Sequence, residues 1–159
     1  MATALAAGLL GLFGTVVGAV LTTWTARQTT DRSDRRAREE RRRQEYRSAV
    51  IRFAAALGAY RVAEMDLWHA LRGGRKDKAT AAAEVYSART ATWNAFYELE
   101  LSTDNRDLIQ QARRALDSAS SIWRPDSEPD AQQEMDRRAN QVNEDLAEMI
   151  TTARISQPG

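Results

Sequence analysis

The feature that most constrains this chain is an uncharged stretch at its start. Residues 1–26 contain no charged side chain, whereas all 23 basic and 22 acidic residues lie at or after Arg27. As a helix, residues 2–24 would be about 35 Å long, against a hydrocarbon core of about 30 Å. Trp24 lies at the end of the stretch, where an indole ring favours the headgroup boundary. The sequence therefore predicts a single transmembrane helix over residues 1–26.

Two other interpretations of this stretch are less favoured. A cleaved signal peptide would carry Lys or Arg before its apolar region, and none precedes it here. The stretch is also longer than the apolar region of an ordinary signal peptide. A helix buried in a globular core would rarely run so far without one charge.

Nine arginines follow the predicted span closely and determine its expected orientation. Because basic flanks remain on the cytoplasmic side, we expect a single-pass protein of the cell membrane with its body in the cytoplasm and a short N-terminus outside. This basic flank consists of Arg27, Arg32, Arg35, Arg36, Arg38, Arg41, Arg42, Arg43 and Arg47.

Residues 27–45 are predicted to be a solvated helical connector. The run lacks Pro and Gly, and it places acids four residues before arginines, as in Asp31–Arg35 and Glu39–Arg43. Each such pair stabilises an exposed helix by about 0.3 kcal/mol. The arginines favour anionic lipid headgroups as their partner. Nucleic acid and a protein surface stay open as alternatives, although interleaved acids and the lack of aromatic residues argue against a dedicated nucleic-acid site.

Small residues recur along one side of the predicted span. Gly14 and Gly18 form a GxxxG motif, and Ala7, Gly11 and Thr22 extend it at helical spacing. Such a face lets two membrane helices approach closely, which predicts a homo-oligomer formed through this face. The same residue types are also common in membrane helices that do not pair, so both interpretations stay open.

The body of the chain, residues 46–155, has the periodicity of four amphipathic helices. We expect them at about 46–71, 77–101, 105–123 and 130–154, with a disordered tail at 156–159. Gly73 and Gly74 end the first helix. The run Ser102-Thr103-Asp104-Asn105 offers N-cap candidates for the third helix, with Asp107 near its third position. Since no segment alternates with period two, the predicted fold is all-α: an antiparallel bundle that continues from the membrane helix.

The apolar positions of each predicted helix are expected to face the core. The first helix offers Tyr46, Val50, Phe53, Ala54, Leu57, Tyr60, Met65, Leu67, Trp68 and Leu71. The second offers Ala82, Val85, Tyr86, Trp93, Phe96, Tyr97 and Leu99. The third offers Leu108, Ala112, Ala115, Leu116, Ala119, Ile122 and Trp123, and the fourth Met135, Ala139, Val142, Leu146, Met149 and Ala153.

The sequence holds little that points to catalysis. There is no cysteine, and the only histidine, His69, lacks partners at metal-ligand spacing, so we expect no catalytic site, no metal and no cofactor. Glu64 is the most interesting carboxylate because it interrupts the apolar stripe of the first body helix. It is expected either to pair with Arg89 or Arg113 or to reach solvent at the rim of the core.

Three segments together cover most of the chain: GLLGLFGTVVGAVLTTW followed by TARQTTDRSDRRAREERRRQEYR, then SAVIRFAAALGAYR, and then LELSTDNRDLIQQARRAL. In these segments the chain resembles the small actinobacterial membrane proteins described as KilB-like, which are associated with the spread of conjugative plasmids. The resemblance implies a membrane protein that assists DNA transfer by binding other membrane transfer proteins, and it brings no catalytic residues.

These observations predict a non-enzymatic, membrane-anchored accessory protein of plasmid spread that binds itself or other transfer proteins. The alternative is a membrane-tethered nucleic-acid-binding protein that uses the arginine-rich connector.

Overall fold

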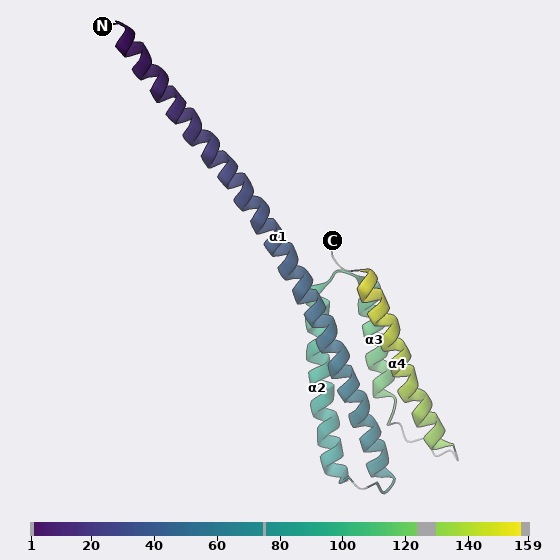
Figure 1. Ribbon diagram of the computed structural model, residues 1–159. Helices are drawn as coiled ribbons and strands as arrows, with labels where there is room; N and C mark the ends of the chain where they lie inside the picture. Colours follow the sequence, from purple (N-terminus) through teal and green to yellow (C-terminus); the bar gives the residue numbers. More distant parts are fainter. Residues whose placement is uncertain (1, 75, 124–129, 157–159) are drawn as a thin grey trace. The chain divides into compact units, whose positions relative to one another are not determined.

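The computed structural model describes the backbone of residues 2–74, 76–123 and 130–156, and the side chains of these ranges from residue 35 onward. Within these ranges the protein has four helices and no strand, which confirms the predicted all-α class (Figure 1). They are α1 (Ala2–Leu71), α2 (Lys78–Ser102), α3 (Arg106–Ser120) and α4 (Ala131–Ile155).

The chain divides into two compact units, Met1–Arg41 and Arg42–Gly159, so the division falls within α1. In the first unit the backbone is helical from Ala2. The predicted span and its packing face lie where the structure describes no side chains. Across the ranges whose side chains are described, no helix combines the length and apolar character that crossing a bilayer requires.

The second unit is an antiparallel helical bundle, in which consecutive helices run in opposite directions (Figure 1). Its core is built on the predicted stripe of α1, where Phe53 and Leu57 are fully buried. The Phe53 ring lies 6.1 Å from that of Phe96 on α2. The Tyr46 hydroxyl donates a 3.0 Å hydrogen bond to the backbone oxygen of Ala153 on α4. These contacts connect α1 to helices on both sides of the bundle.

Alanine allows close packing of α3 and α4. Ala112, Ala115 and Ala119 on α3 are completely buried, and Ala139 and Ala153 on α4 are almost completely buried. Small side chains let the axes of α3 and α4 lie close together. Each alanine therefore buries little apolar area but makes many van der Waals contacts. The predicted core positions of α4 are confirmed, with Leu146 partly buried beside the core.

The helix ends follow local backbone chemistry. Gly73 has a φ of +88°, and the amides of Gly73 and Gly74 donate to the carbonyls of Ala70 and His69. This is a Schellman arrangement, which uses glycine because its missing Cβ permits the left-handed conformation. At the start of α3, Asn105 Oδ1 accepts hydrogen bonds from the amides of Asp107 and Leu108 at 3.0 and 3.1 Å. The predicted glycine end of α1 is confirmed, and of the four N-cap candidates predicted for α3 the structure uses Asn105.

The buried face of α2 differs from the prediction. Ala82, Tyr86 and Tyr97 were expected in the core but are exposed, whereas Thr92 is fully buried. The Thr92 hydroxyl lies 2.8 Å from the Ala88 oxygen and 3.1 Å from that of Ala56 on α1. Because these two carbonyls satisfy the Thr92 hydroxyl, this polar side chain can face the core. The face of α2 that is buried is therefore not the most apolar face of the helix.

Helix α3 also ends earlier than the predicted residue 123. It stops at Ser120, and a guanidinium nitrogen of Arg138 on α4 donates a 2.9 Å hydrogen bond to the Ser121 carbonyl. A side chain from another helix thus satisfies a carbonyl at the helix end. Ile122 is still buried beyond this point, but Trp123 is 42% exposed.

Asn105→Ala is expected to destabilise the bundle by about 1–2 kcal/mol, because it removes the cap of α3. It also removes the 2.6 Å hydrogen bond from Asn105 Nδ2 to the Ser156 hydroxyl. Urea unfolding followed by circular dichroism would measure the loss. The matched control is Asn143→Ala, because Asn143 is exposed within α4. An equal effect of both substitutions would contradict the capping role.

Candidate functional site

The described part of the basic flank is solvent-facing. Arg35, Arg36, Arg38, Arg41, Arg42 and Arg47 are exposed on α1, and Arg43 is half-buried. Arg38, Arg43 and Arg47 each have an interaction partner. Glu39, Glu40 and Glu45 are exposed beside them, so the surface has mixed charge with a basic excess. Arg27 and Arg32, the remaining members, lie where side chains are not described.

A second feature lies within the bundle, where Glu64 of α1 is only 1% exposed. It lies one helical turn after Tyr60, whose hydroxyl forms a hydrogen bond with the Glu64 carboxyl group. The other carboxyl oxygen, Oε2, is buried and has no hydrogen-bond partner among the described residues. A buried polar atom without a partner is costly and uncommon in folded proteins.

Burial dominates the electrostatics of Glu64. Loss of solvent raises its pKa from 4.5 to about 7, although the Tyr60 hydrogen bond and the charge of Arg89 both act to lower it. The pKa of Tyr60 is raised as well, by burial first and then by its hydrogen bond and charge interaction with Glu64. The carboxyl group is therefore poised to exchange a proton near neutral pH.

Of the two predicted partners of Glu64, Arg89 interacts with it and Arg113 does not. The Arg113 guanidinium instead lies over the Trp93 ring, 4.6 Å from its centroid, and 3.6 Å from the carboxylate of Asp117. The alternative that Glu64 reaches solvent at the rim is wrong, because its neighbours cover it.

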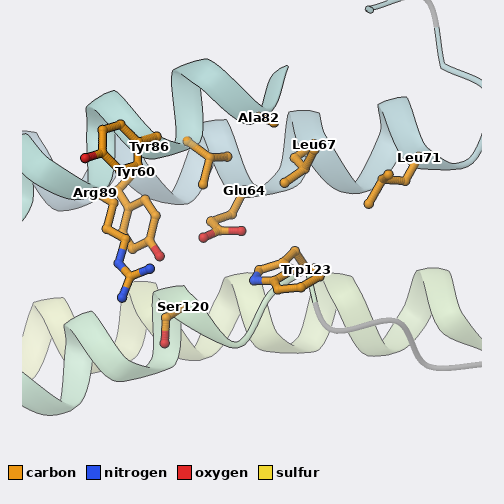
Figure 2. Close-up of a pocket in the computed structure, with 10 residues that line it drawn as sticks. Tyr60, Glu64, Leu67, Leu71, Ala82, Tyr86, Arg89, Ser120 and Trp123 are labelled. Carbon is orange, nitrogen blue, oxygen red and sulfur yellow. The ribbon is translucent and has the colours of Figure 1, made fainter. Parts of the chain in front are cut away.

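Glu64 lines a groove of about 620 Å³ that is formed by α1, α2 and the end of α3. Figure 2 shows the carboxyl group between Tyr60 and Arg89 on one side and Trp123 on the other. Apolar side chains make up most of the remaining lining: Leu67, Leu71, Ala82, Val85 and Tyr86. The sequence indicated Glu64 as an exception in the stripe, but it gave no signal for the groove.

His69, the only histidine, is exposed on α1, and its ring lies edge-on to that of Trp68 at 5.0 Å. Among the residues with described side chains, no group of three His, Asp or Glu residues is arranged to hold a metal ion.

The described fold and site define a helical-bundle protein with an arginine-rich helical flank and one buried, incompletely bonded carboxyl group. A family model described as KilB plasmid transfer protein matches residues 47–157. The match covers more than half of the chain, so the chain belongs to this family of plasmid transfer proteins and the predicted resemblance is confirmed. Comparisons with curated proteins and with solved structures find no match.

Glu64→Gln is expected to weaken the pH dependence of stability. The raised pKa means that the folded chain holds a proton that the unfolded chain releases between pH 4.5 and about 7. Stability contributed by Glu64 is therefore present at low pH and is lost as the pH rises through this window, by up to about 3 kcal/mol.

Urea unfolding at about pH 4 and about pH 8 would test this, because these values bracket the window. The wild type should lose more stability between them than Glu64→Gln. Glu98→Gln is the matched control, since Glu98 is half-exposed and pairs with Arg52. Equal losses for the wild type and Glu64→Gln would contradict the buried, raised-pKa state of Glu64.

Proposed function

We propose that this protein is a membrane-anchored, non-enzymatic accessory of plasmid transfer. Residues 1–26 span the cell membrane, the bundle lies in the cytoplasm, and the protein acts by binding itself or other membrane transfer proteins. The observation that carries this proposal is that the 23 uncharged residues 2–24 are helical and belong to the same helix, α1, as the exposed arginines.

The physical chemistry of lipid supports the anchoring step. A helix satisfies its own backbone hydrogen bonds, which a segment exposed to lipid must do. Arginines just beyond the span attract anionic headgroups, with each adding about 1 kcal/mol near the surface. Membership of a plasmid transfer family supports the biological role.

Two surfaces are proposed for binding partners. Two copies associate through the packing face of the span, which consists of Ala7, Gly11, Gly14, Gly18 and Thr22. The basic flank binds anionic headgroups. Nucleic acid is the less favoured partner of the flank, because the exposed Glu39, Glu40 and Glu45 reduce its positive potential.

Val16→Arg is expected to release the protein from membranes. Val16 lies near the middle of the predicted span, where a charge costs about 3 kcal/mol or more. Fractionation with alkaline carbonate should leave the wild type in the membrane pellet and move a substantial part of the variant to the supernatant. Thr29→Arg, which adds the same charge in the connector, should behave as the wild type. Complete extraction of the wild type by carbonate would contradict the anchor.

The double substitution Gly14→Ile and Gly18→Ile is expected to reduce self-association by blocking close approach of two spans. Chemical cross-linking in native membranes would measure the fraction of dimer. Ala6→Ile with Thr23→Ile is the matched control, because helical spacing puts both positions away from the packing face. An unchanged dimer fraction in the glycine variant would show that the face is not used.

A further inference from the structure

The groove beside Glu64 has the properties of a binding site that neither membrane anchoring nor self-association uses. Its floor carries a charged side chain that is 1% exposed and whose Oε2 has no hydrogen-bond partner among the described residues. Its walls are mostly apolar, and they come from α1, α2 and the end of α3 (Figure 2). Glu64 Oε2 therefore lacks a hydrogen-bond donor, and a ligand could supply one.

We propose that this groove binds a small hydrophobic amine. Because Oε2 is closed to solvent in this structure, the Glu64 side chain turns toward the groove on binding. The ammonium group of the ligand then donates a hydrogen bond to Oε2, and its apolar body lies against Leu67, Val85 and Trp123.

The size and the lining of the groove favour a small molecule. Its volume of about 620 Å³ lies within the range of about 300–1,000 Å³ that is typical of small-molecule sites. Leu71, Tyr86 and Trp123 at its edge are 44%, 75% and 42% exposed, so they offer apolar area that a ligand can cover. Tyr60, Tyr86 and Trp123 also provide aromatic rings, whose faces attract cations.

The charges around Glu64 favour a cation over a neutral or anionic ligand. The charged or titratable groups in the groove lining are Tyr60 and Glu64 from α1 and Tyr86 and Arg89 from α2. The rest of the described lining near α3 is Ser120 at its last turn and Trp123 just beyond it. Arg89 is exposed, and its charge lowers the pKa of Glu64 by less than burial raises it. An ammonium group in direct contact would compensate the carboxylate as Arg89 does not.

Three ligands of nearly equal size separate these interactions: phenethylamine, 2-phenylethanol and phenylacetate. Each is titrated calorimetrically at about pH 8, where most Glu64 is ionised, into the full chain in phosphatidylcholine nanodiscs, with empty nanodiscs as the blank. We expect phenethylamine to bind at least about tenfold more tightly than 2-phenylethanol, because a charge-assisted hydrogen bond is added. Phenylacetate is expected to bind most weakly.

Two variants identify the groups involved. Glu64→Gln should weaken phenethylamine binding about tenfold or more and leave 2-phenylethanol binding unchanged. Trp123→Ala, which changes a partly exposed residue of the wall, should weaken both ligands. Glu98→Gln, a half-exposed carboxylate outside the groove, should change neither.

Several results would overturn the proposal. These are the absence of binding by all three ligands at millimolar concentration, equal binding of the amine and the alcohol, or tightest binding of phenylacetate. Unchanged amine binding in Glu64→Gln or in Trp123→Ala would also overturn it. None of these results bears on membrane anchoring, so the two proposals fail independently.

Discussion

The bundle depends above all on burial of the apolar stripe of α1. Phe53 and Leu57 are inaccessible to solvent, and Tyr46 connects the stripe to the backbone of α4. Each large side chain buried in this way stabilises the fold by about 2 kcal/mol, and α2, α3 and α4 are the surfaces that cover it. Since α1 also includes the uncharged residues at the start of the chain, the helix that organises the core is the one that we propose as the anchor. The core of the bundle and the proposed anchor therefore both belong to α1.

Glu64 is the exception within that stripe, because it is a buried carboxyl group among apolar side chains. A buried carboxyl group with one unbonded oxygen works against stability, and its pKa of about 7 reflects that cost. Tyr60 and Arg89 reduce the cost without removing it. A chain selected for stability alone would more simply carry leucine at this turn of α1. The presence of a buried carboxyl group beside an apolar groove is the observation on which the proposed ligand-binding role rests.

Local signals in the sequence were reliable where the backbone itself determines the outcome. Gly73 and Gly74 end α1, Asn105 begins α3, and the spacing of apolar residues in α4 gives its buried face. On α2, Phe96 and Leu99 are buried as predicted, but Ala82, Tyr86 and Tyr97 are exposed. Thr92 is buried instead because carbonyls of α1 and of its own helix satisfy its hydroxyl, which periodicity alone does not reveal. At the end of α3, the Ser121 carbonyl accepts a hydrogen bond from Arg138 of α4, a contact that the sequence of α3 does not reveal. Likewise, the sequence placed Glu64 on the core side of its helix, but its degree of burial depends on α2 and on Trp123.

The proposed role of residues 1–26 is to hold this bundle at the membrane for plasmid transfer. The most direct measurement compares plasmid transfer frequencies in cells that express the full chain, a chain without residues 2–24, and a chain in which an unrelated single membrane span replaces them. We expect loss of transfer without the span and at least partial recovery with the unrelated span. Transfer at the wild-type frequency by the chain without residues 2–24, at matched protein levels, would show that the span is not required.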